Sequence, residues 1–152
     1  LFPEREFPEY ESIGKIVVKK SERKLFAYSV DGRLLKTYRI SLGRKPKGSK
    51  QFEGDGRTPE GAYIINGKNS KSGYHKNLGI SYPEIKDLKN AGKMGKSPGG
   101  DVKIHGLKNG YGFVGKFQRW KDWTNGCIAV TNREMDELFD HTKIGIPIII
   151  VL

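Results

Sequence analysis

The stretch TNGCIAV, residues 124–130, contains the single cysteine of this 152-residue chain, and the stretch IHG, residues 104–106, contains one of its three histidines. Each lies beside a glycine at the edge of a short apolar run, which predicts that both side chains sit at strand ends. A cysteine is a nucleophile as its thiolate, and histidine is the usual base that activates it. The segment between His105 and Cys127 is long enough to loop out and let two strands lie side by side.

The glycine before the sulfur favours a catalytic interpretation, because Gly126 leaves its backbone N–H unshielded and suited to an oxyanion. The residues alone also allow a structural interpretation. A single cysteine is often a small buried hydrophobic residue, and a single histidine is often a satisfied structural one. A zinc site is disfavoured because Cys127, His105 and His75 lack paired-ligand spacing and there is no second cysteine. We therefore predict no metal and no cofactor.

Four motifs, taken in order, resemble the L,D-transpeptidase family (the YkuD domain). His105-Gly106 followed by TNGCI at 124–128 is similar to its active-site signature, in which a histidine precedes a Ser/Thr-His-Gly-Cys element. Three earlier segments agree in the same order: SLG at 41–43, GDGRTPEGAY at 54–63 and LGISYP at 78–83. Together the motifs extend over most of the chain from about Lys15 to Leu152.

The resemblance implies a mainly β domain, a β-sandwich of two mixed sheets with a few short helices, at residues 15–152 after an N-terminal arm or linker end at residues 1–14. It also implies a reaction. Cys127 would attack the amide between the third residue of a peptidoglycan stem peptide and the terminal D-alanine, forming a thioester. His105, oriented by the carbonyl of Gly106, would act first as base and then as acid, and an amine from a second stem would complete a cell-wall crosslink.

The resemblance further assigns the oxyanion hole to the amides of residues 125–127 and substrate contacts to Thr124 and Trp123. Two positions depart from the family pattern: Asn125 stands where histidine is commonest, and Ala129 where many members carry a polar or basic residue. Asparagine offers a donor and an acceptor but cannot titrate. Three functions follow: an L,D-transpeptidase, an L,D-carboxypeptidase or endopeptidase that hydrolyses the same peptides, or a non-catalytic basic wall-binding module.

The net charge of +11 and the isoelectric point near 9.7 indicate a polyanionic environment. Nucleic acid is disfavoured because no recognition-helix, zinc-finger or RNA-binding pattern is found. Peptidoglycan stem peptides and an anionic cell-wall polymer account for the charge, and solubility is the alternative explanation. No run of apolar residues is long enough to predict a membrane span. We expect a periplasmic or extracellular location in the cell envelope, with the export signal outside this sequence, because the chain begins at Leu1.

Alternation and turn signals predict the other elements. Asp31-Gly32 predicts a hairpin, and residues 43–59 predict a loop in which Arg44 and Lys50, with Lys45 and Lys47, either contact an anionic ligand or are mobile in solvent. Helices are predicted at residues 83–92 and from Thr131, where Glu134 completes a capping box. A final strand is predicted at residues 144–152.

The segment between the histidine and cysteine motifs is rich in glycine and aromatic residues. Residues 110–115 fit G-x-G-x-x-G, but no strand–helix–strand unit surrounds them, so nucleotide binding is disfavoured. We expect a glycine-hinged lid whose aromatic side chains, including Trp120 and Trp123, line the substrate groove, or else anchor a long loop on the core. His75 is expected either to line the site or to be structural.

Overall fold

The computed structural model describes residues 7–8, 10–71, 73–107 and 122–152, and its centre is one mixed sheet of eight strands. Branched and aromatic residues dominate these strands, which is typical of half-buried pleated segments. The strands are β1 (Ile13–Lys19), β2 (Lys24–Ser29), β3 (Leu34–Arg39), β4 (Gly61–Asn69), β5 (Asn77–Ile80), β6 (Lys103–His105), β7 (Ile128–Ala129) and β8 (Pro147–Val151).

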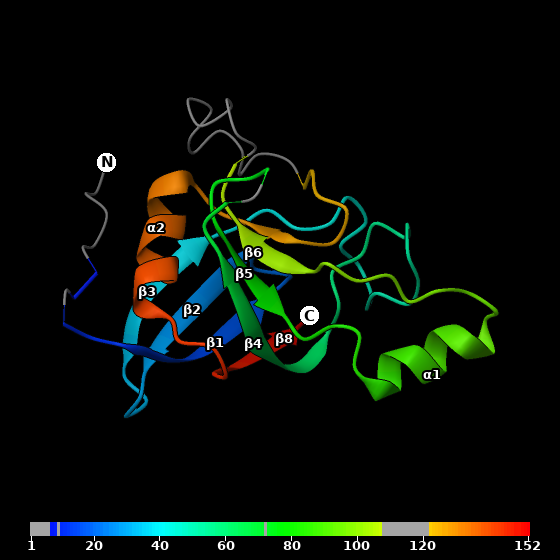
Figure 1. Ribbon diagram of the computed structural model, residues 1–152, viewed down its shortest axis with the longest axis horizontal. Helices are drawn as coiled ribbons and strands as arrows, with labels where there is room; N and C mark the ends of the chain where they lie inside the picture. Colours follow the sequence, from blue (N-terminus) through cyan, green and yellow to red (C-terminus); the bar gives the residue numbers. More distant parts are fainter. Residues whose placement is uncertain (1–6, 9, 72, 108–121) are drawn as a thin grey trace.

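The strand order is β3-β2-β1-β8-β4-β5-β6-β7, with β1–β8 and β6–β7 parallel and the other pairs antiparallel. The sheet curls strongly (Figure 1). At its far end, Ser41, two residues beyond β3, exchanges two backbone hydrogen bonds of 2.9 Å each with Ala129 of β7. The two ends of the strand order therefore meet, and the apolar core fills the inside of the curl.

The predicted separation into two packed sheets is wrong, although the mainly β, mixed character and the few short helices are confirmed. The reason lies in β4. Its first residues pair with β8 and its last residues pair with β5, with a register shift between Ile65 and Gly67. A bulge of this kind bends a strand and increases its twist, so one long strand carries the sheet around the corner.

Two helices flank the sheet. Helix α1 (Ile85–Lys93) extends from one side, and helix α2 (Asn132–His141) covers the opposite end near β3 (Figure 1). The predicted capping box of α2 is confirmed, since Thr131 Oγ1 accepts from Glu134 N and the Glu134 carboxylate accepts from Thr131 N. Met135 and Leu138 are the buried apolar side chains of α2. Among the described residues, no helix is long and apolar enough to cross a membrane.

The basic loop after Leu42 is anchored to the sheet through a buried lysine. Lys20 is 1% exposed, and its Nζ donates to the carbonyls of Gly48 (2.9 Å) and Thr58 (2.7 Å) and to the Glu60 carboxylate (3.1 Å). Burial holds the pKa of Lys20 below its ordinary value, against the opposing effect of Glu60. Lys50 is also buried, so the alternative that it is mobile in solvent is wrong.

Candidate active site

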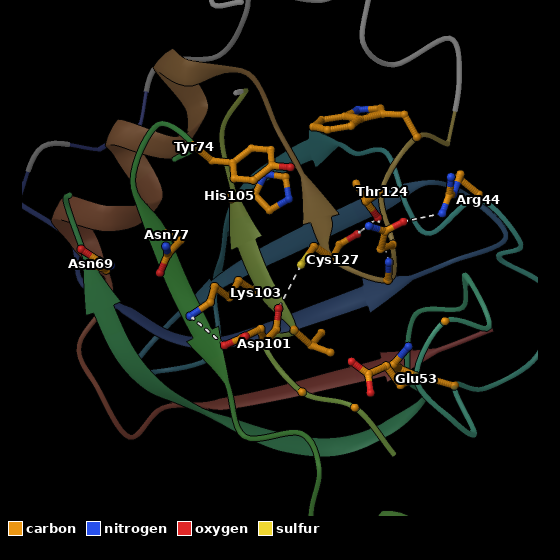
Figure 2. A pocket seen from close by; sticks show the side chains of 18 residues that line it. Arg44, Glu53, Asn69, Tyr74, Asn77, Asp101, Lys103, His105, Thr124 and Cys127 are labelled. Atoms are coloured by element: carbon orange, nitrogen blue, oxygen red, sulfur yellow. Dashed lines mark hydrogen bonds and ion pairs between the residues drawn. The ribbon is translucent and has the colours of Figure 1, made fainter. Parts of the chain in front are cut away.

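The two residues expected to carry the chemistry line one cavity of about 760 Å³. His105 is the last residue of β6, and Cys127 directly precedes β7, its parallel neighbour, in which Ile128 pairs with Ile104. The turn before β7 therefore brings the sulfur toward the end of β6. Figure 2 shows the His105 ring and the Cys127 sulfur facing the same space. The chain thus brings a thiol and an imidazole together, as predicted from the two motifs.

The tautomer of His105 is fixed by the backbone. Its Nδ1 lies 2.6 Å from the carbonyl oxygen of Gly106, and a carbonyl can only accept a hydrogen bond. Nδ1 therefore carries the proton, and Nε2 is left with a lone pair. The imidazole is 4% exposed and packs against Tyr74, with ring centroids 4.3 Å apart, and Trp123, at 5.6 Å. The ring is held in position by its neighbours and kept largely out of water.

Burial sets the resting charges of both groups. It lowers the pKa of His105 below its ordinary 6.5, and the hydrogen bond to Gly106 opposes this only in part. It raises the pKa of Cys127 above its ordinary 9.0, although a backbone hydrogen bond from Lys103 and the charge of its side chain act in the opposite direction. At neutral pH the free protein therefore holds a neutral thiol and a neutral imidazole, which is the starting state for general-base catalysis rather than a preformed ion pair.

The resting thiol points to a carbonyl. Cys127 Sγ donates to the backbone oxygen of Asp101 at 3.2 Å, and no hydrogen bond to His105 accompanies it within the described part of the chain. Asp101 has φ +54°, in the left-handed region that non-glycine residues seldom adopt, so its carbonyl is presented by an unusual backbone turn. The thiol must rotate from Asp101 toward Nε2 before it can transfer its proton.

The turn that presents the nucleophile requires a glycine. Gly126 has φ +135°, and a Cβ built on it would lie 2.7 Å from the carbonyl oxygen of Arg57. Its N–H donates to Thr124 Oγ1 (3.2 Å), and the Thr124 hydroxyl donates to the Cys127 carbonyl (2.6 Å). Asn125 accepts from the Arg44 guanidinium at 2.5 Å. Residues 124–127 therefore form a tightly bonded turn, in which the Gly126 amide is already engaged.

Sequence reasoning missed Asn132, whose side chain fixes the peptide group that orients His105. Asn132, the first residue of α2, accepts from the N–H of Leu107 at 2.9 Å. That N–H belongs to the same peptide group as the Gly106 carbonyl, which in turn accepts from His105. His75 fixes the same segment, since its carbonyl accepts from Gly106 N at 3.0 Å and its N–H donates to Leu107 at 2.8 Å. His75 is thus structural, and its ring contacts Asp136 at 2.7 Å.

Substitution of Asn132 should therefore affect the reaction through His105. In Asn132→Ala the Gly106–Leu107 peptide group loses the hydrogen bond that fixes its N–H and keeps only the one from His105 to its carbonyl. We therefore expect kcat to fall roughly ten- to hundredfold while KM changes little. Asn132→Asp keeps the acceptor oxygen and should recover most of the activity. Arg133→Ala, an exposed neighbour on α2, serves as the control. Steady-state kinetics of the three variants check this, and equal activity of Asn132→Ala and Arg133→Ala would contradict it.

The pKa directions predict a broad pH profile. The acid limb of kcat/KM should lie below pH 6.5, since protonation removes the base, and the alkaline limb above pH 9.0, since ionisation of the thiol removes the proton that His105 returns to the leaving group. Tyr74→Ala opens the imidazole to water, so its acid limb should move to higher pH. A bell centred near pH 6 in the unmodified protein would show that the resting pair is instead ionised.

Comparison with known proteins places this geometry in a family. Residues 14–150 match the L,D-transpeptidase catalytic domain. The chain belongs to the L,D-transpeptidase family. YafK of Escherichia coli (strain K12), itself assigned to the L,D-transpeptidases, is 32% identical over 129 residues, which cover 82% of this chain and 45% of YafK.

Two solved structures share the fold. Bd1075 of Bdellovibrio bacteriovorus superimposes with a TM-score of 0.64 at 25% identity, over 95% of this chain and 49% of that one. The helical cell shape determining protein Pgp2 of Campylobacter jejuni gives a TM-score of 0.67 at 23% identity, over 93% of this chain and 48% of that one. This chain therefore spans about half the length of these relatives.

The remaining predictions for the L,D-transpeptidase site divide by location. Trp123 lies against His105, whereas Trp120 and the expected lid fall at residues 108–121, outside the described residues.

Within the described ranges, no group of three or more His, Cys, Asp or Glu side chains is arranged to hold a metal ion. Arg44 and Lys50 of the predicted basic loop line the cavity, whereas Lys103 has no sequence signal that marks it, because the pairing of β5 with β6 brings it there.

Proposed function

We propose that this domain is a cysteine L,D-transpeptidase that acts on peptidoglycan stem peptides through a thioester with Cys127. The observation that carries the proposal is the imidazole of His105, which shares a cavity with the thiol and has its Nδ1 proton held by the Gly106 carbonyl. That arrangement leaves Nε2 as a base facing a nucleophile. Membership of the family supports the substrate class.

In the first half-reaction, Nε2 of His105 takes the Sγ proton as the sulfur leaves the Asp101 carbonyl and attacks the carbonyl carbon of the third stem residue. The resulting oxyanion accepts hydrogen bonds, in our proposal chiefly from the amides of Asn125 and Cys127, since the Gly126 amide also bonds Thr124. The C–N bond then breaks, and Nε2 returns its proton to the departing amine. D-Alanine is released, and the peptide remains bound to Cys127 Sγ as a thioester.

In the second half-reaction, an amine of another stem attacks the thioester carbon and gives its proton to Nε2. The C–S bond breaks, and the Cys127 thiolate recovers that proton, so a crosslink forms and the resting site returns. Water in place of the amine makes the enzyme an L,D-carboxypeptidase or endopeptidase, and a basic wall-binding module without chemistry is the other alternative. The cavity, which is open and lined by polar side chains, is compatible with either acceptor.

The same proposal includes the protein's surroundings. The domain at residues 15–152 would work in the periplasmic or extracellular cell envelope, with residues 1–14 as an arm or linker end. The charge of +11 suits peptidoglycan carboxylates and an associated anionic polymer. Neither nucleic acid, a metal nor a cofactor has a role in this mechanism.

Mass spectrometry of a disaccharide-tetrapeptide incubated with the protein tests the proposal. A crosslinked dimer with loss of D-alanine supports the transpeptidase, and tripeptide alone supports the hydrolase. A transient mass increase of the protein itself, equal to the mass of the disaccharide-tripeptide less water, identifies the thioester. Unchanged tetrapeptide and unmodified protein would support the non-catalytic alternative.

A further inference from the structure

Two polar side chains that line the cavity beside His105, Asn77 and Lys103, take no part in the mechanism above. We call them the polar wall. Asn77 of β5 is 4% exposed and lines the cavity. It pairs directly with His105 in the antiparallel β5–β6 ladder, so the two side chains are neighbours on one face, with Cβ atoms roughly 5 Å apart. None of the residues that the structure describes hydrogen-bonds the Asn77 side chain. Its polar atoms are not sealed from solvent, so the amide faces the cavity with its donors and acceptor available to a ligand.

A cation lies next to that amide. Lys103 precedes His105 by two residues on β6, and residues two apart in a strand face the same side. Among the described residues, its ammonium is paired only with Asp101, at 3.8 Å, and the Asp101 side chain is 96% exposed. An ion pair this long and this exposed binds weakly, so the ammonium retains donors for another acid. Lys103 and Asn77 together offer one positive charge and an amide on the same wall.

The reaction determines which part of the substrate meets this wall. His105 must come within hydrogen-bond reach of the departing nitrogen, roughly 3 Å, to protonate it. In a peptide that ends with a D-amino acid, the terminal carboxylate is attached two bonds from that nitrogen, so it must lie on the His105 side of the sulfur. Figure 2 shows Asn77 and Lys103 on that side, with Thr124 and Arg44 on the other.

From this juxtaposition we propose that Lys103 and Asn77 bind the free α-carboxylate of the leaving D-amino acid, which makes the domain selective for stem peptides that end at the scissile bond. The inference rests on the function proposed above. It predicts that the domain cuts chain ends and rejects the same bond where the D-residue is amidated or already joined to another group. A neutral carboxamide leaves the Lys103 charge without its partner.

Binding to the Cys127→Ala protein tests this without requiring turnover. Calorimetry should show that the tetrapeptide ending in D-alanine binds roughly 10- to 100-fold more tightly than its C-terminal carboxamide, as expected for a charge-assisted contact. Adding Lys103→Met should reduce the ratio to near one, and Lys103→Arg should retain it. Adding Asn77→Asp should invert it by repulsion. Lys93→Met, which removes an exposed cation at the end of α1, outside the cavity, should leave the ratio unchanged.

Equal affinity for acid and carboxamide, equal loss of both with Lys103→Met, or no binding of either peptide would overturn the subsite. The proposed function fails separately. If the unsubstituted protein converts neither peptide while the Cys127→Ala protein still prefers the acid, the subsite stands and the transferase does not. If it converts the acid and the carboxamide at equal rates, the transferase stands and the subsite does not.

Discussion

Cys127→Ala protein is expected to lose at least about 10⁴-fold in the rate of D-alanine release, to the level of the uncatalysed reaction. In the proposed mechanism the sulfur forms the thioester on which both half-reactions depend, and no second cysteine exists in the chain to replace it. A general base acting on water alone would give at most slow hydrolysis and no crosslink. The measurement is the rate of D-alanine release together with the mass of the protein during turnover.

Two controls separate lost chemistry from lost structure. Cys127→Ser keeps the size of the side chain but replaces the thiol with a hydroxyl, whose far higher pKa makes it a poor nucleophile, so we expect a similar loss. Cys127→Ala should still bind the tetrapeptide and unfold at nearly the same temperature, because Cys127 contributes little to the apolar core. Crosslinking above a few per cent of the normal rate by either variant would exclude the thioester mechanism.

His105→Gln should reduce kcat by roughly 10²- to 10⁴-fold, the usual range for loss of a general acid–base. Glutamine approximates the size of imidazole and can donate to the Gly106 carbonyl, but it cannot accept a proton and return it. The defect should be smaller for a donor with a thioester in place of the scissile amide, since a thiolate leaves without protonation. That difference separates the acid role of His105 from its role as base.

His141→Gln is the matched control. Nδ1 of His141 lies 2.9 Å from the Glu11 carbonyl, and its ring packs 4.2 Å from Phe7, outside the cavity. We expect full activity from this variant. If His105→Gln and His141→Gln lose the same amount, or if His105→Gln is equally impaired on amide and thioester donors, then His105 does not act as the proton carrier.

Short-range chemistry explains which features were predictable from the sequence. The proximity of Cys127 and His105, and of the Gly106 carbonyl to the imidazole, could be predicted because each residue belongs to a local motif at a strand end. The capping box at Thr131 and the helix after Pro83 also depend on neighbours within a few residues, and both were found. Local preference was sufficient wherever the partners were close in sequence.

Long-range pairing explains what was missed. The single curled sheet depends on β4, whose two halves pair with strands from opposite ends of the domain. Lys50, taken for a loop lysine, is buried because Asp55 accepts its ammonium at 3.1 Å behind the nucleophile turn. Asn77 and Lys103 face the cavity because of the β5–β6 register, and a shift of one residue would turn both away.

The meeting of the sheet's two ends at Ser41 and Ala129 limits how a peptide can dock. Extended peptides often bind by adding a strand to an exposed sheet edge, where main-chain groups supply affinity without regard to side chains. Beside Cys127 that edge is occupied. Ser41 uses both main-chain groups of Ala129, and Leu42 and Arg44 bond the N–H and carbonyl of Thr124 at 3.2 and 3.0 Å. If the proposed function holds, a peptide at this cysteine is therefore selected by its side chains and end groups rather than by the main-chain hydrogen bonds of an added strand.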